Sequence, residues 1–355
     1  MKKEGLFSHF EYATVRRYKD IIEVAKDFDI FWDSPMKFIH LLPWQQKIKE
    51  QFIFWKQHFD QERAIDTLNT LQISCIEISN PAYPSLLKQI TDPPICLFVR
   101  GTLLNLDQIS AVVGTRKYTS YGQRVTEQIT KTFAINNCTL ISGLALGIDA
   151  IAHHTAITHG IRTIAVVAGG VDEDSLSPKP NIRLSQKILQ DGGAIISEYP
   201  PGFKPETYTF PRRNRIIAGL SQEVIVTEAP MRSGALITAH LALDYNREVA
   251  AIPHSIENIQ GMGCNDLIAN GARCIYNIAE MFTASSSQQH ITTQKQLSLS
   301  PIEQKIYQVL SFEPTGIKQI LQKVPLSEPQ ILSTLTKLEI SDVIKNIGGM
   351  QYILC

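Results

Sequence analysis

The segment SGLALGIDAIAHHTA, residues 142–156, decides the fold class because it joins an expected strand to an expected helix through glycines. The preceding CTLIS is apolar and β-branched enough for a buried parallel strand, and the residues that follow have helical spacing. A strand that turns through glycines into a helix leaves unpaired backbone N–H groups, and such groups suit an anion. The segment therefore indicates either a phosphate site or only a tight turn between a strand and a helix.

Six apolar stretches alternate with helix-length segments between Ile109 and Phe282: ISAVVGTR, CTLISG, RTIAVVAGG, GAIISEY, QEVIVTEA and REVAAIP. This alternation is typical of parallel strands joined by right-handed crossovers. We therefore expect an α/β fold with a doubly wound sheet of about six strands. Such sheets bind ligands where the carboxyl ends of their strands meet, so the loops after these strands form the candidate site.

The remaining residues predict further parts of the chain. Residues 1–75 are rich in aromatic and charged residues and indicate a small helical N-terminal domain, so the sheet domain spans residues 76–285. Residues 286–298 are polar and predict a flexible linker. Residues 299–355 hold three helical segments and two strands around a Gly-Gly turn, a pattern typical of a C-terminal winged-helix domain.

Composition limits the classes of function. The chain has 355 residues, 44% of them hydrophobic, and a formal net charge of zero, so any nucleic-acid site must be a local cluster of Arg and Lys. The six cysteines lack C-x-x-C spacing and indicate free thiols in a reducing cytoplasm. No segment resembles a signal peptide or a membrane span. We expect a cytoplasmic protein that contacts no membrane and binds no metal.

Glycine, serine and threonine recur in the loops after the expected strands, as in GTRKYTSYG (114–122) and SGLALGID (142–149). Several such loops at one sheet edge favour a ligand that carries phosphate. The dinucleotide fingerprint G-x-G-x-x-G is absent after the first strand, and the P-loop motif is absent from the sheet. We therefore expect no nucleotide cofactor, and a phosphate-rich ligand that is not clamped at a pyrophosphate fits better.

The segment FPRRNRIIAGLS (210–221) contains the sharpest cluster of cations. A helix is expected to start here with one aromatic residue and three arginines, and one lysine lies slightly upstream. These residues are Lys204, Phe210, Arg212, Arg213 and Arg215. Guanidinium groups bind phosphate oxygens and a phenyl ring stacks on an unpaired base, so the combination suits single-stranded nucleic acid. A solvent-exposed charged helix start has the same pattern, but Arg116 at a neighbouring strand end favours a basic groove.

Other polar residues near the strand ends have structural explanations. His153 and His154 have no carboxylate or cysteine at ligand spacing, which favours packing or surface positions over metal binding. Asp149 is most simply a first-turn acid that pairs with exposed helix N–H groups. Glu198 and Glu228 each end a strand, where they could form a general acid and base pair or hold nearby arginines in place.

Several motifs together resemble the bacterial DNA-processing protein A family, also called DprA or Smf. They are VGTR (113–116), SGLALGIDAIAH (142–153), GGVD (169–172), SE with PPG (197–202), FPRRNRIIAGLS (210–221), SGALITA (233–239) and GCNDLIANGA (263–272), in family order. The resemblance implies an extended Rossmann-like domain that binds single-stranded DNA, protects incoming strands during natural transformation and helps to load the RecA recombinase. It also implies a homodimer, a SAM-like or degenerate domain at residues 1–75, and no catalytic reaction.

The resemblance further implies DNA-contacting residues. Carried over by motif, they are Gly114, Thr115, Arg116, Ser142, Gly143, Phe210, Arg212, Arg213 and Arg215, and the charge argument adds Lys204. Leu144 stands where the family usually has a second glycine, so we expect it to tighten one side of the pocket. No motif assigns the surfaces for dimerisation or for RecA.

Two other classes of function stay open at this point. A nucleotide-processing phosphoribohydrolase would also have a glycine-rich Rossmann-like fold, but that family shows P-G-G-x-G-T-x-x-E, whereas AGGVDED (168–174) lacks the Gly-Thr. A transcription regulator would use the winged helix, although only Lys337 and Lys345 add charge near its expected recognition helix and wing.

Overall fold

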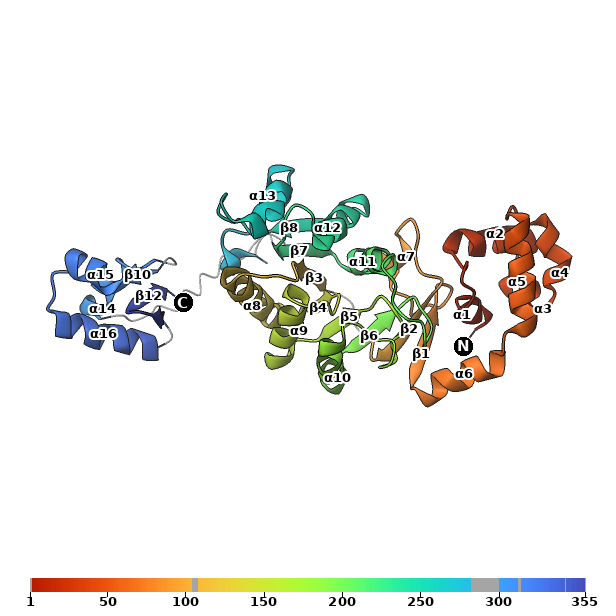
Figure 1. The fold of residues 1–355 in the computed structure, drawn as a ribbon, viewed down its shortest axis with the longest axis horizontal. Coiled ribbons are helices and arrows are strands. Elements are labelled where there is room, and N and C mark those ends of the chain that lie inside the picture. The colour runs from red at the N-terminus through yellow and green to blue at the C-terminus, as the bar shows by residue number, and fades with distance from the viewer. Residues whose placement is uncertain (1, 104–107, 282–299, 312–313, 342, 355) are drawn as a thin grey trace. The chain divides into compact units, whose positions relative to one another are not determined.

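The structure is a computed structural model and describes residues 2–103, 108–281, 300–311, 314–341 and 343–354 (Figure 1). The chain divides into two units, Met1–Ser285 and Ser286–Cys355, and each has a hydrophobic core of its own. The expected linker, residues 286–298, lies outside the described residues. No described helix combines the length and the apolarity that crossing a membrane requires.

Helices form the first part of the larger unit, as predicted. They are α1 (Lys3–Phe7), α2 (Val15–Ala25), α3 (Phe28–Asp33), α4 (Pro35–Phe38), the 3-10 turn η1 (Ile39–Leu41), α5 (Gln46–His58) and α6 (Gln61–Thr70). Phe7, Phe31 and Phe52 are fully buried among them, and the Phe52 ring lies 6.0 Å from Phe7 and 5.5 Å from Phe31 between centroids. Aromatic packing therefore supplies the core of this helical part.

A nine-stranded sheet forms the centre of the larger unit, in the order β1-β2-β6-β5-β4-β3-β7-β8-β9. Its parallel strands are β3 (Ile109–Gly114), β4 (Thr139–Ser142), β5 (Thr163–Val166), β6 (Ala194–Ser197), β7 (Glu223–Glu228), β8 (Glu248–Ala251) and β9 (Arg273–Cys274). Strands β4, β5 and β6 lie on one side of β3, and β7 and β8 lie on the other, so the order reverses between β3 and β7. This topology confirms the predicted doubly wound sheet.

The sheet has three strands more than the approximately six that the sequence predicts. At one edge β1 (Ile73–Glu77) pairs antiparallel with β2 (Cys96–Gly101), and β2 pairs antiparallel with β6. At the other edge the short strand β9 follows β8. The pairing of these edge strands does not follow from sequence pattern, because an apolar run carries no information about its pairing partner.

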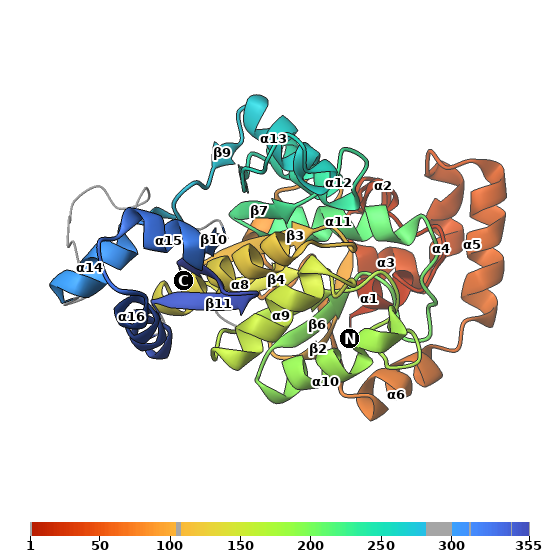
Figure 2. The same cartoon turned by 60° about the vertical axis from the view of Figure 1, so that its left-hand side comes forward.

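Helices cover both faces of the sheet, as Figures 1 and 2 show. One face packs against α7 (Ser85–Lys88), α11 (Thr209–Leu220), α12 (Gly234–Asp244) and α13 (Met262–Ala269), and the other against α8 (Ser120–Ile135), α9 (Ile148–Thr158) and α10 (Ile182–Gln190). The 3-10 turns are η2 (Lys179–Asn181), η3 (Ile259–Gly261) and η4 (Ile278–Glu280). Val112 and Val113 enter different cores because successive side chains of a strand face opposite sides. Burial on both faces explains the continuous apolar runs in the sequence.

The smaller unit is the predicted winged-helix domain. It contains α14 (Pro301–Tyr307), β10 (Thr315–Gly316), α15 (Ile317–Lys323), α16 (Glu328–Ile340), β11 (Ile344–Gly348) and β12 (Gln351–Leu354). The strands form a three-stranded sheet in the order β10-β12-β11, and Gly348 and Gly349 form the turn of the hairpin with positive φ. The capping box of Ser300 and Glu303 starts α14.

Candidate nucleic-acid interface

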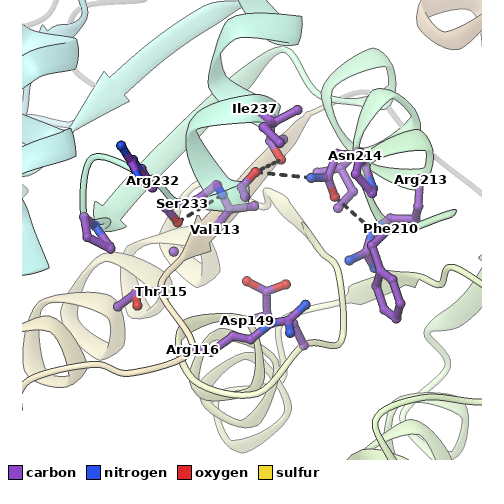
Figure 3. A pocket seen from close by; sticks show the side chains of 18 of the residues that line it. Val113, Thr115, Arg116, Asp149, Phe210, Arg213, Asn214, Arg232, Ser233 and Ile237 are labelled. Atoms are coloured by element: carbon purple, nitrogen blue, oxygen red, sulfur yellow. Dashed lines mark hydrogen bonds between the residues drawn. The ribbon is translucent and has the colours of Figure 1, made fainter. Parts of the chain in front are cut away.

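A cleft of about 720 Å³ opens at the carboxyl ends of β3 and β7, where the strand order reverses (Figure 3). Its walls come from the loops after these two strands, the first turn of α9, and the first residues of α11 and α12. Ligands bind doubly wound sheets at this switch point, because the crossovers leave it in opposite directions. The cleft therefore lies where the topology places a ligand.

The end of β3 and the loop after it contribute three of the predicted site residues to the cleft. Gly114 permits a close approach of α9, since a Cβ there would lie 2.6 Å from Cγ1 of Ile148. Thr115 is buried, and its backbone N–H donates to the carbonyl of Glu228 at 2.7 Å, which fixes the loop to the end of β7. Arg116 is exposed in the cleft, and its guanidinium carbon lies 5.8 Å from the centroid of the Phe210 ring.

Helix α11 contributes Phe210 and Arg213 to the same cleft. Arg213 is buried, and its Nη1 donates to the carbonyls of Gly143 and Val166. Burial lowers the pKa of Arg213 to about 10, and the nearby carboxylate of Asp149 partly opposes this shift. The guanidinium therefore stays charged at neutral pH, as a fixed cation in the inner wall of the cleft.

The other two arginines of α11 point elsewhere. Nε of Arg212 lies 3.4 Å from Oε1 of Glu198, and Arg215 forms a buried ion pair with the other oxygen of the same carboxylate. Nε of Arg215 also lies 3.3 Å from Oδ2 of Asp92. Both arginines line a second cleft of about 360 Å³, next to residues 8–16 of the helical N-terminal part. The predicted arginine cluster is therefore divided between two clefts.

Besides Arg212 and Arg215, three further predicted residues do not line the cleft at the switch point. Ser142 is fully buried, and its hydroxyl donates to the carbonyl of Val112 at 2.7 Å. Gly143 lies behind Arg213, where a Cβ would come within 2.7 Å of the guanidinium. Lys204 is exposed, and its ammonium donates to the carbonyl of Asp174 at 2.6 Å. Ser142 and Gly143 thus support the wall of the cleft from behind.

Comparison with known proteins identifies the family. The sequence model described as DNA recombination-mediator protein A matches residues 74–286, and a second model, the DprA winged helix domain, matches residues 291–350. The chain belongs to the DprA family. Protein Smf of Synechocystis sp. is 36% identical over 314 residues, covering 77% of this chain and 78% of the relative. The DNA processing protein DprA of Bacillus subtilis is 41% identical over 212 residues, covering 59% and 70% respectively.

Two solved structures of the DprA family resemble this chain. DprA of Streptococcus pneumoniae superposes with a TM-score of 0.67 at 32% identity, covering 81% of this chain and 97% of that one. DprA of Helicobacter pylori superposes with a TM-score of 0.54 at 32% identity, covering 61% and 96%, and its description concerns a single-stranded DNA binding mode. Both matches place the fold described above within the DprA family.

Sequence reasoning did not single out two exposed cations of the cleft. Lys117 follows Arg116 directly, and Arg232 lies in the loop after β7, one residue before Ser233, whose side chain caps α12. Both occupy loops at the carboxyl ends of central strands. That position alone is a sufficient signal to include a cation in a candidate site of a doubly wound sheet.

The two acidic residues at the strand ends, Glu198 and Glu228, form ion pairs and hydrogen bonds with other parts of the fold. Glu198 holds Arg212 and Arg215, in agreement with one of the two interpretations of its position. Glu228 accepts hydrogen bonds from the backbone N–H and the hydroxyl of Thr119, at 2.8 and 2.7 Å, at the N-cap of α8. The interpretation of Glu228 as a residue that holds an arginine is therefore wrong, since its partner is a helix start.

Leu144 and Asp149 also differ from expectation. Leu144 has a φ of 55°, in the left-handed region that favours glycine, and its side chain is buried in a core cluster rather than in the cleft. Leu144, which stands where the family usually has glycine, therefore fills the core and does not tighten the pocket. Asp149 lies in the first turn of α9, but its Oδ2 accepts the N–H of Gly143, 3.0 Å away in the preceding loop.

Proposed function

We propose that this DprA family member binds single-stranded DNA in the cleft between β3 and β7. The observation that carries the proposal is the exposed Arg116 guanidinium over the Phe210 ring at the topological switch point. Lys117 and Arg232 add two more exposed cations to the same cleft in a chain whose formal net charge is zero. A local group of cations beside an aromatic ring is the combination that single strands require.

In the proposed complex the exposed cations contact phosphate oxygens and Phe210 stacks on an unpaired base. Arg213 is a buried cation that adds positive potential without leaving its carbonyl partners. Gly114 and Thr115 bring backbone close to the DNA strand, and Ser142 and Gly143 support the cleft wall from behind. Arg212 and Arg215 hold Glu198 at the second cleft. Contacts to phosphate and to ring faces carry little sequence information, so these contacts alone give a slight base preference.

We infer that the protein acts in DNA recombination without catalysing a reaction, by protecting incoming strands during natural transformation and loading RecA onto them. The family description, DNA recombination-mediator protein A, supports this role. The strand-end carboxylates Glu198 and Glu228 are engaged with arginines and with a helix start, which supports a binding role over general acid and base chemistry. A cytoplasmic location is part of the proposal, since the described cysteines are free thiols.

We further propose that the protein is a homodimer, so that two clefts share one strand. Large apolar side chains are exposed in the segment after β7, namely Leu243, Ile256, Ile259, Met262 and Tyr276. Ile256 is 89% exposed and Tyr276 is 80% exposed, values that favour a surface covered by another molecule. Analytical ultracentrifugation of an Ile256→Lys, Tyr276→Lys variant tests this surface, and an unchanged sedimentation coefficient would exclude it.

The experiment that tests DNA binding is a salt titration of Arg116→Ala. Loss of one phosphate contact should weaken binding of a thymidine oligonucleotide about tenfold at low salt and flatten the slope of log Kd against log salt by about 0.7. Lys131→Ala is the matched control, because Lys131 is an exposed cation on α8 outside the cleft lining. Equal affinities and slopes for both variants and the unaltered protein would contradict the proposal.

A further inference from the structure

Two cysteine side chains lie next to each other at one border of the large sheet. Cys75 is on β1 and Cys96 is on β2, and the antiparallel register places Cys75 opposite Phe98 and Cys96 opposite Glu77. Directly opposite residues of paired strands point to the same face, and so do residues two positions apart on one strand. The Sγ atoms of the two cysteines are 2.6 Å apart. The fold therefore brings together two thiols from different strands.

The separation of the two sulfurs suits a covalent bond between them. Both residues are free thiols in the structure, and their sulfurs need to approach by less than about one ångström to form a disulfide. β1 is the outermost strand of the sheet, so a small shift of its side chain or backbone displaces no strand beyond it. The structure thus holds the reduced form of a pair that can be cross-linked.

Burial distinguishes the two thiols. Cys96 is 1% exposed, whereas Cys75 is only half-buried. Burial raises the pKa of the Cys96 thiol well above its usual range, and the hydrogen bond with Cys75 raises it further. A dissolved oxidant therefore meets Cys75 first, while Cys96 remains a thiol beside it. An accessible cysteine next to a second one that resolves it is the arrangement on which reversible oxidation depends.

The other described cysteines have no such neighbour. Cys138 and Cys264 are buried, and each thiol donates to an oxygen atom at 3.6 Å. Cys274 is half-buried on β9, at the opposite border of the sheet. Within the described part of the chain, Cys75 and Cys96 are the pair whose sulfurs are in contact.

We propose that Cys75 and Cys96 are a modification site that hydrogen peroxide converts into a reversible disulfide. The Cys75 sulfur attacks one peroxide oxygen, the O–O bond breaks, and the other oxygen leaves as water with the thiol proton, so that Cys75 becomes a sulfenic acid. The Cys96 sulfur then attacks the Cys75 sulfur, the S–O bond breaks, and the hydroxyl leaves as water with the Cys96 proton. The two thiols lose two electrons, and one peroxide becomes two waters. A dithiol reductant reverses the change.

The cross-link forms where the helical N-terminal part joins the sheet. β1 follows α6 in the chain and packs against α1 and α6. A bond from β1 to β2 restricts the unfolded chain, so the oxidised protein is expected to be more stable. Neither cysteine lines the cleft at the switch point, so both forms should bind DNA equally. The inference is therefore independent of the proposed DNA binding.

The test treats the full-length protein with an equimolar amount of hydrogen peroxide and counts thiols in denaturant with dithionitrobenzoate. The count should fall from six to four, because one disulfide consumes two of the six cysteines, and dithiothreitol should restore it. Trypsin cleaves after Lys88, which separates the two cysteines, so mass spectrometry without reduction should find their peptides joined and lighter by two hydrogens. The Tm of the oxidised protein should rise by about 4 °C or more.

Two variants make the test specific. Cys75→Ser leaves five of the six cysteines, and all five should stay reduced under the same treatment. Cys274→Ser is the matched control, because it removes the other half-buried cysteine among the described residues, and it should still lose two thiols and form the same joined peptides.

Three results would overturn the inference. The first is a count that stays at six in the unaltered protein, a measurement that needs no variant to fold. The second is a cross-link between other cysteines, or a Cys75 sulfinic acid without a cross-link. The third, an unchanged Tm of the cross-linked protein, would overturn the stabilising role of the bond.

Discussion

Arg212 and Arg215 stand three residues apart on α11, so the helical pitch places them on one face, and Arg213 lies on another. The shared face explains why both meet Glu198, while Arg213 reaches the carbonyls beneath the cleft. The sequence predicts the cluster and its helix. The single basic groove expected for all three arginines does not form, because helical spacing separates Arg213 from the other two. The sequence could not predict the burial of Arg215, because the acidic partners Glu198 and Asp92 come from other elements.

At the residue scale we predict that Arg215→Met destabilises the fold without weakening DNA binding. The change leaves the buried carboxylate of Glu198 without its closest cation, which should lower the free energy of unfolding by about 3–5 kcal/mol. Chemical denaturation measures this loss, and adding Glu198→Gln to the variant should restore part of it. A normal stability together with a large loss of affinity for single strands would show that Arg215 contacts DNA.

At the element scale, α9 is fixed to the sheet by a buried histidine. His153 is fully buried, and its Nδ1 lies 2.7 Å from the hydroxyl oxygen of Thr163 on β5. The sequence predicts both elements from their periodicity and allows a packing position for His153. It could not predict which strand the histidine meets, because the partner depends on the parallel pairing of β4 with β5.

Burial lowers the pKa of His153 to about 3, which predicts a loss of stability in acid. The unfolded chain takes up a proton near pH 6.5 and the folded chain does not, so stability is full above pH 6.5 and falls as the pH drops towards about 3. At pH 5 this group alone should reduce the free energy of unfolding by about 2 kcal/mol relative to pH 7.5.

Denaturation at both pH values measures the effect. His153→Leu should lose most of this pH dependence, while His240→Gln, which changes an exposed histidine on α12, should keep it. Burial raises the pKa of Asp149, so that residue acts in the opposite direction, with stability favoured below its raised pKa. An equal pH dependence of the His153→Leu and unaltered proteins would contradict the prediction.

At the scale of the whole molecule, every residue that lines the cleft belongs to the unit Met1–Ser285. The winged-helix unit has its own core, which includes Ile306, Leu335 and Tyr352. We therefore predict that residues 1–285 alone bind single strands within about twofold of the full chain, with the same salt slope. Fluorescence anisotropy of both proteins with one labelled oligonucleotide checks this, and a tenfold loss on truncation would mean that the winged helix contributes to binding.

The antiparallel strands β1 and β2 also affect whether copies of this protein can associate through the edges of their sheets. β2 occupies the hydrogen-bonding groups of β6, and β1 in turn packs against α1 and α6. At the opposite border β9 spans only two residues. Among the described residues, one border strand packs against helices and the other is only two residues long, so neither provides a long, exposed edge for the addition of a foreign strand. Crowding on a shared DNA molecule should therefore not convert this protein into fibrous aggregates by strand addition.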